Sequence, residues 1–180
     1  MHQLQESRRA AVIPSRKYLR AFLATAAFIV ALDRISKLWA EQQLAGGKRI
    51  ALIGRFLGLS LVHNPGGAFG TFPGASLFLF IASVAIVGVV IRWAWKGTAS
   101  PYALGLVLGG GLGNVIDRMV NAPGIMRGRV TDFIDVSFWP TFNFADSAIV
   151  VGIVLILLSN KRRSAKAADE TGADDAKLSD

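Results

Sequence analysis

The sequence predicts an all-α membrane protein, a four-transmembrane-helix bundle with a small surface β-element in its first outer loop. Its composition supports this fold class, because 52% of its 180 residues are hydrophobic and its mean hydropathy is +0.45. Four long apolar segments divide the chain, and basic residues gather beside them. A helix of about 20 residues crosses the hydrocarbon core of a bilayer, and each segment reaches this length once its polar ends are counted.

The four predicted spans form one membrane domain over residues 18–160. The second span is almost free of charge, the third is rich in glycine, and the fourth begins with polar residues. Their approximate ranges are 18–39, 75–95, 102–119 and 142–158.

The first span resembles a secretory signal peptide in one respect, since a basic stretch precedes the apolar run at residues 21–32. However, Asp33, Arg34 and Lys37 follow this run directly, and no A-x-A-like cleavage site is present. We therefore expect a retained transmembrane helix.

Lys and Arg in the short flanks of the spans favour a cytoplasmic position for both termini. Residues 1–17 are predicted to form a basic cytoplasmic arm. Residues 161–180 lack the apolar side chains that a core needs and are predicted to form a disordered cytoplasmic tail. In this topology the start of the fourth span lies near the outer face of the membrane.

Two outer loops connect the spans, at about residues 41–74 and 120–139. The first contains β-branched and alternating apolar residues broken by Gly and Pro, which predicts short strands on the membrane surface. The second contains Pro, Gly and aromatic residues, which is typical of a loop at a membrane interface.

The charge and the residue usage exclude several classes of site. The net charge is +8, but the basic residues flank apolar segments and form no stripe on a soluble fold, so nucleic acid is not an expected partner. There is no Cys, which excludes disulfides and thiol catalysis. With two His residues and no H-E-x-x-H motif, we expect neither a metal site nor a cofactor.

Polar residues that are costly in a bilayer converge at one depth of the predicted topology, near the outer leaflet. Ionisable residues inside a membrane segment usually mark a functional site. The set is Asp33, His63, Asn64, Asn114, Asp117, Arg118, Asp132, Asp135, Asn143 and Asp146.

Most of these residues also have a purely structural interpretation. Asp33 and Lys37 have the spacing of a helical ion pair. Asn143 comes three residues after Pro140 and suits a helix N-cap, and Asn64 precedes Pro-Gly-Gly as in a turn. Arg118 is able to neutralise nearby carboxylates. His63 is interpreted as a loop or interfacial residue and not as a ligand.

Asp132 and Asp146 are harder to explain as structural residues, because both flank the start of the fourth span. If the second outer loop folds back on this span, the two carboxylates meet in a semi-occluded site. Two carboxyl groups a few Å apart share one proton and titrate as a pair. Such a pair is the basis of aspartic-protease chemistry, in which one carboxylate activates water and the other polarises the scissile carbonyl.

Five blocks of the sequence resemble, in order and spacing, the lipoprotein signal peptidases, which are the bacterial type II signal peptidases. The blocks lie within about residues 18–160. They are DRISK (33–37), VHNPGGAF (62–69), GGGLGNVIDR (109–118), VTDFID (130–135) and FNFADSAI (142–149).

This resemblance implies an aspartic endopeptidase of the bacterial cytoplasmic (inner) membrane, with its active site near the periplasmic face. Such enzymes remove the signal peptide of a prolipoprotein by cutting just before its diacylglyceryl-modified Cys. The implied partners are lipidated prolipoproteins, membrane lipids and the cyclic-peptide inhibitor globomycin.

The resemblance also assigns roles to residues. By motif, the catalytic pair is Asp132 and Asp146. The residues that support them or bind substrate are Asp33, Lys37, Asn64, Asn114, Asp117, Arg118 and Asn143.

Between Arg118 and Asp132 the chain carries MVNAPGIMRGR, which is longer than the family pattern leads us to expect.

The alternative from a different class is a small proton-coupled membrane transporter, since membrane carboxylates often serve as proton relays. Transporters usually contain paired halves with interrupted helices at matching positions. The sequence shows no such internal repeat, and its charges gather at one depth. A purely structural membrane scaffold would leave the clustered Asp and Asn residues without a role.

Overall fold

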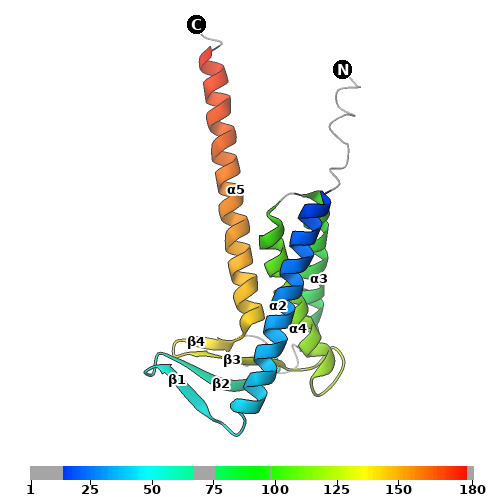
Figure 1. Cartoon of the computed structure of the whole chain (residues 1–180), viewed down its shortest axis with the longest axis vertical. Coiled ribbons are helices and arrows are strands. Elements are labelled where there is room, and N and C mark those ends of the chain that lie inside the picture. The colour runs from blue at the N-terminus through cyan, green and yellow to red at the C-terminus, as the bar shows by residue number, and fades with distance from the viewer. Residues whose placement is uncertain (1–13, 67–75, 98, 178–180) are drawn as a thin grey trace.

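The structure is a computed structural model that describes residues 14–66, 76–97 and 99–177, with side chains described up to residue 160. Four long helices lie side by side, and a small sheet covers one end of them (Figure 1). The helices are α2 (Arg16–Gln43), α3 (Ser76–Lys96), α4 (Pro101–Val120) and α5 (Phe144–Lys177). The strands are β1 (Arg49–Ile53), β2 (Leu57–Asn64), β3 (Val130–Val136) and β4 (Trp139–Phe142).

The helices begin close to the predicted span boundaries. Two of them, α3 and α4, are long and apolar enough to cross a membrane, and residues 144–160 of α5 form a shorter apolar stretch. α3 carries the highest mean hydropathy of the candidate spans, 2.3, and most of its surface is exposed, as expected of a helix that faces lipid. The count of four spans remains a prediction.

Two predicted ends differ from the structure or fall outside it. α5 is helical to Lys177, well past the predicted span end at 158 and into the segment predicted to be disordered. Ala, Lys, Arg and Glu in this segment are strong helix formers, so the helix is able to continue without a packed core. Most of the predicted basic arm lies outside the described residues, and its last two residues belong to α2.

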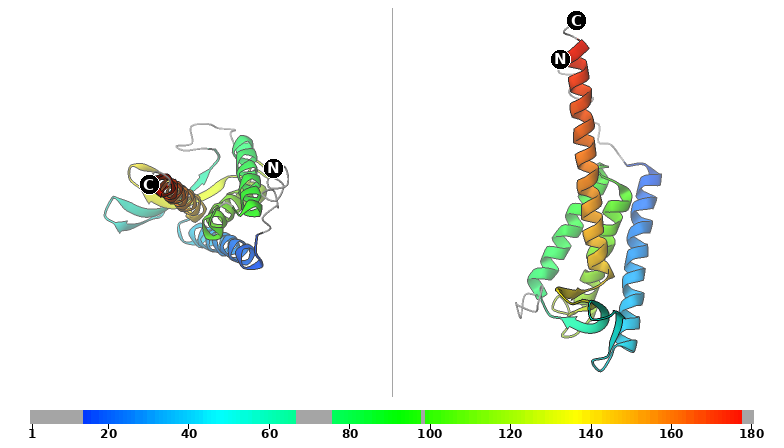
Figure 2. Two further views of the ribbon diagram at one scale, coloured as in Figure 1. Left: turned by 90° about the horizontal axis from the view of Figure 1, so that it is seen from above. Right: turned by 90° about the vertical axis from the view of Figure 1, so that its left-hand side faces the viewer.

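α4 lies at the centre of the bundle and contacts each of the other three helices (Figure 2). Its glycines permit this close approach. A Cβ added to Gly109 would lie 2.7 Å from the carbonyl oxygen of Ala26 in α2, and one added to Gly110 would collide with the carbonyl of Ala145 in α5. Small residues let helix backbones pack tightly in membranes, where the hydrophobic effect does not drive helices together.

The sheet is antiparallel, with strand order β1-β2-β3-β4. The prediction of strands in the first outer loop is confirmed by β1 and β2. The prediction that residues 120–139 form only a loop is wrong, because β3 and the start of β4 lie in this segment. VTDFIDV is rich in β-branched and aromatic residues, which favour a strand, and pairing with β2 makes this segment the third strand.

The register of the β2–β3 pair brings Asn64 close to Asp132. Asp132 lies opposite Val62, and Thr131 lies opposite His63. Asn64 of β2 pairs with Val130, two residues before Asp132, so Asn64 and Asp132 are diagonal neighbours on the same face of the sheet. Figure 1 shows that this part of the sheet lies against the ends of α2 and α4 and the beginning of α5.

We predict that Gly110→Ala destabilises the bundle by about 1–3 kcal/mol, because the added methyl group overpacks the α4–α5 contact. The measurement is the free energy of unfolding in detergent micelles. Gly88→Ala is the matched control, since nothing lies within 4 Å of a Cβ at this position of α3. This variant should be neutral or more stable, and equal destabilisation by both substitutions would contradict the proposed close contact.

Candidate active site

Asp132 is buried on β3 and accepts two side-chain hydrogen bonds. Asn64 Nδ2 donates to its Oδ2 at 3.0 Å, and Asn143 Nδ2 donates to its Oδ1 at 2.6 Å. Only 2% of Asp132 is exposed, so these two amides replace the water that a carboxylate otherwise binds.

Asp146 lies in the first turn of α5 and forms a reciprocal cap with Asn143. The backbone N–H of Asp146 donates to Asn143 Oδ1 at 2.9 Å, and the backbone N–H of Asn143 donates to Asp146 Oδ2 at 3.3 Å. The other oxygen, Oδ1, accepts from Asn114 Nδ2 at 2.7 Å. This arrangement satisfies two helix N-terminal donors and fixes the carboxylate of Asp146, as in a capping box.

Asp132 and Asp146 line one pocket of about 390 Å³ at the junction of the sheet and the helices. Asn64, Asn114 and Arg118 also line it. Asn143 links the two carboxylates directly, because its side chain donates to Asp132 while its backbone N–H donates to Asp146. The structure thus brings Asp132, from the second outer loop, and Asp146, from the start of the last predicted span, into one pocket.

Burial, and to a smaller extent the negative charge of Asp146, raises the pKa of Asp132 to about 7. The hydrogen bonds from Asn64 and Asn143 and the charge of Lys37 act in the opposite direction but do not offset burial. The site therefore favours a protonated Asp132 below neutral pH, in the way expected when two carboxyl groups share a low-dielectric pocket.

Arg118 faces the same pocket from α4. Its Nη1 donates to the backbone carbonyl of Asn114 at 3.3 Å. Its Nε is buried, and within the described residues no acceptor lies in hydrogen-bond reach of it. Because Arg118 lines the pocket, its guanidinium group places a positive charge beside the paired carboxylates.

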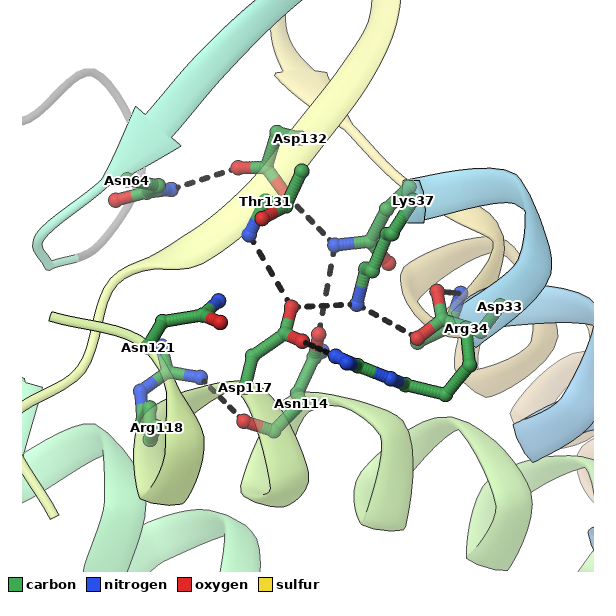
Figure 3. A network of polar contacts seen from close by, with 12 residues as sticks. Asp33, Arg34, Lys37, Asn64, Asn114, Asp117, Arg118, Asn121, Thr131 and Asp132 are labelled. Atoms are coloured by element: carbon green, nitrogen blue, oxygen red, sulfur yellow. Dashed lines mark hydrogen bonds and ion pairs between the residues drawn. The ribbon is translucent and has the colours of Figure 1, made fainter. Parts of the chain in front are cut away.

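A buried ion network lies behind the pocket (Figure 3). Lys37 Nζ is 2.6 Å from Asp33 Oδ2 and 2.8 Å from Asp117 Oδ2, and all three side chains are almost completely buried. Arg34 Nη1 contacts the other oxygen of Asp117 at 2.7 Å. The predicted Asp33–Lys37 helical pair is present, but it is one half of a larger cluster.

The network also holds the two segments that carry the pocket carboxylates. Asp33 Oδ1 accepts the backbone N–H of Ala145 at 3.0 Å, and Ala145 directly precedes Asp146. Asp117 Oδ2 accepts the backbone N–H of Thr131 at 3.1 Å, and Thr131 directly precedes Asp132. One cluster therefore positions both carboxylates through their neighbours.

Three positioning residues were not found from the sequence. Arg34 belongs to the DRISK block but was not singled out. Glu41 Oε1 accepts a hydrogen bond from Thr131 Oγ1 at 3.0 Å and lies 2.8 Å from His63 Nε2. Thr131 and His63 are paired across β3 and β2, so Glu41 connects the last turn of α2 to both strands. Nothing in the composition near Glu41 or Thr131 signals this contact, which joins residues half the chain length apart.

Asp135 does not join the pocket. It forms an ion pair with Arg49 Nε at 2.6 Å, and both side chains are partly exposed. In the part of the chain that the structure describes, no group of three or more His, Cys, Asp or Glu side chains is arranged to hold a metal ion.

The fold and the pocket define a membrane protein with paired carboxylates where its helix bundle meets its sheet. A family model described as "Signal peptidase (SPase) II" matches residues 25–161. The chain therefore belongs to the signal peptidase II family, and it is a membrane peptidase.

Relatives and solved structures agree with this assignment. A lipoprotein signal peptidase of Rhodococcus jostii (strain RHA1) is 42% identical over 136 residues, which cover 74% of this chain and 68% of the relative. One of Mycobacterium leprae (strain Br4923) is 39% identical over 153 residues, which cover 82% and 74%. A bacterial membrane enzyme solved by the in meso method at 2.3 Å is similar with a TM-score of 0.70 and 28% identity, over 81% of this chain and 90% of that one.

We predict that Lys37→Met destabilises the protein by about 3–5 kcal/mol, because it leaves two buried carboxylates without their shared cation. The measurement is the free energy of unfolding in detergent micelles. Arg49→Gln breaks the partly exposed pair with Asp135 and should cost about 1 kcal/mol or less. A Lys37→Met variant as stable as Arg49→Gln would contradict a central role for the network.

Proposed function

We propose that this protein is an aspartic endopeptidase in which Asp132 and Asp146 form the catalytic pair. The observation that carries the proposal is the single pocket lined by both carboxylates, in which Asn143 contacts each of them. Family membership supplies the reaction class, peptide-bond hydrolysis. The chemistry of paired carboxyl groups supplies the mechanism.

In the proposed reaction Asp132 carries the proton of the pair and Asp146 is ionised. Asp146 takes a proton from a water molecule as this water attacks the scissile carbonyl carbon. Asp132 donates a hydrogen bond to the carbonyl oxygen and then passes its proton to the leaving amine as the carbon–nitrogen bond breaks. The proton that Asp146 took from water then returns the pair to its singly protonated starting state. The positive charge of Arg118, which lines the same pocket, stabilises the negative charge that develops on the substrate carbonyl.

Three asparagines hold the carboxylates of this pair in fixed positions. Asn64 and Asn143 hold both oxygens of Asp132, and Asn114 holds one oxygen of Asp146. Asn64 lies on β2, Asn114 on α4, and Asn143 at the junction of β4 and α5. Because these elements hold the amides, the carboxylates do not have to reorganise when charge develops. Asp33, Lys37 and Asp117 support the pair through the backbone of Ala145 and Thr131.

The proposed substrates are prolipoproteins carrying a diacylglyceryl-modified Cys, and the cut falls just before this Cys. The curated relatives are named lipoprotein signal peptidases. An apolar groove of about 460 Å³ beside Asp146, lined by Phe142, Val150 and Val151 among others, suits a lipid chain or a signal helix that arrives through the bilayer. The same groove and pocket are the proposed binding site of a globomycin-type inhibitor.

The proposed topology has four spans in the bacterial inner membrane, with both termini in the cytoplasm and the sheet on the periplasmic side. In Figure 1 the start of α2 and the end of α5 lie at the end of the bundle opposite the sheet. Lysines and arginines close the apolar part of α5 at this end, as the positive-inside rule requires of a cytoplasmic flank.

We predict that Asp132→Asn and Asp146→Asn each lower the rate of prolipoprotein cleavage by at least about 100-fold, because each removes a group that transfers a proton. The measurement is cleavage of a lipidated prolipoprotein by purified protein in micelles. Asp135→Asn is the control on the same strand and should retain most activity, since Asp135 pairs with Arg49 outside the pocket. Near-normal cleavage by either pocket variant would refute the proposal.

Activity should fall as the pH rises through the pKa of Asp132, about 7. Below this pH Asp132 keeps its proton, and above it the pair becomes doubly ionised and loses its acid. Asn64→Leu removes a hydrogen bond that lowers this pKa, so the alkaline limb of the rate profile should move to higher pH. Rates measured from about pH 5 to about pH 9 test this expectation. Asp135→Asn should leave the limb in place, and an Asn64→Leu limb that stays or moves to lower pH would contradict the assignment.

A further inference from the structure

The loop between α4 and β3, residues 121–129, is closed by internal hydrogen bonds, and the proposed mechanism does not use it. It contains the part of the chain that is longer than the family pattern predicts. Its backbone is held by hydrogen bonds from Gly128 N–H to the Arg118 carbonyl at 3.0 Å and from Arg129 N–H to the Ala122 carbonyl at 3.1 Å. Asn121 Nδ2 closes the loop by donating to the Arg129 carbonyl at 2.8 Å.

The loop is also fastened to its neighbours. Ser76 Oγ, at the start of α3, donates to the carbonyl of Gly128 at 3.0 Å. A Cβ added to Gly128 would lie 2.7 Å from the carbonyl oxygens of Asn121 and Asp117, so the loop packs directly on the end of α4. The side chains that it carries are thus presented on a fixed backbone.

Two arginines of this loop border a pocket of about 410 Å³. The pocket is lined by Pro65, Ser76, Leu77, Pro123, Arg127 and Arg129. None of these lining residues is acidic. Across the described residues, the ion pairs of the structure use other cations, and the carboxylates nearest in sequence, Asp117 and Asp132, are engaged elsewhere. Among the residues that the structure describes, no carboxylate therefore neutralises the positive charge of this pocket.

The tip of the loop is apolar. Ile125 is 70% exposed and Met126 is 42% exposed, directly before Arg127. Exposed aliphatic side chains next to arginines are typical of a segment at the boundary between hydrocarbon and headgroups. The position fits, because the pocket includes the first two residues of α3, the most apolar candidate span.

We propose that Arg127 and Arg129 bind the phosphate of an anionic phospholipid headgroup, with Ile125 and Met126 inserted beside its acyl chains. Guanidinium groups pair with phosphate oxygens in a bidentate geometry. At roughly 30 Å³ for each water molecule, the pocket has room for about a dozen waters, and hence for a hydrated phosphodiester. An anionic headgroup is favoured over a zwitterionic one, because the latter would bring a second cation toward two unneutralised arginines.

The test uses the purified full-length protein in neutral detergent micelles. It is titrated with phosphatidylglycerol or with phosphatidylcholine of the same acyl chains, and bound lipid is counted by native mass spectrometry. The wild-type protein should bind phosphatidylglycerol at least about tenfold more tightly, and this preference should weaken with added salt. Arg127→Gln combined with Arg129→Gln should reduce the preference to about twofold or less.

The matched control is Lys48→Gln combined with Arg55→Gln, which removes two exposed charges near the β1–β2 hairpin and outside the pocket. This variant should keep the wild-type preference within about twofold. If the double arginine variant fails to fold, each single variant should lower the preference for phosphatidylglycerol by about threefold. The salt dependence of lipid binding by the wild-type protein tests the same proposal without any substitution.

Equal binding of the two lipids by the wild-type protein would overturn the proposal. So would an equal loss in the hairpin control, which would indicate only a general attraction of the surface charge. Inorganic phosphate at the same concentration as phosphatidylglycerol should not displace the bound lipid. Full displacement would indicate a site for free anions and would contradict a lipid site. Lipid binding is read out independently of peptide cleavage, so its failure leaves the proposed catalytic pair untouched.

Discussion

The ammonium group of Lys37, held between two buried carboxylates, fixes the geometry on which the rest of the site depends. Its Nζ lies 2.6 Å from Asp33 and 2.8 Å from Asp117, which come from α2 and α4. These carboxylates accept the backbone N–H groups of Ala145 and Thr131, the residues directly before the catalytic pair proposed above. A single cation thereby joins two helices, the strand β3 and the start of α5.

This arrangement separates the task of holding the backbone from the task of doing chemistry. Two carboxylates and two cations, Lys37 and Arg34, form the supporting network and largely neutralise one another. Buried ion pairs seldom add much net stability, because desolvation offsets their attraction. The network instead fixes the positions of the two backbone segments that carry Asp132 and Asp146. The two pocket carboxylates line one cavity, and Arg118 is the basic residue among its described lining residues. Burial of Asp132, together with the negative charge of Asp146, raises the pKa of Asp132 and so favours a shared proton.

The sequence predicted the helices and the location of the pair because both leave local signals. Apolar runs of span length mark helices, and costly carboxylates such as Asp132 and Asp146 stand out within or beside them. The third and fourth strands were missed because Pro and Gly nearby suggested a loop, and only pairing with β2 reveals β3. The contacts of Asp33 and Asp117 with backbone N–H groups have no sequence signal, since every residue except proline carries such a donor. Glu41 was missed for a similar reason, because its partner Thr131 lies 90 positions away.

The most direct test of the account is an infrared titration of the Asp132 carboxyl group in the wild-type protein and in Asp146→Asn. The account predicts a protonated carboxyl band that disappears near pH 7 in the wild-type protein. In Asp146→Asn this transition should move to lower pH, because a negative neighbour has been removed. An unchanged midpoint in the variant, or an Asp132 that is already ionised well below neutral pH in the wild-type protein, would show that the two carboxyl groups do not share one electrostatic site.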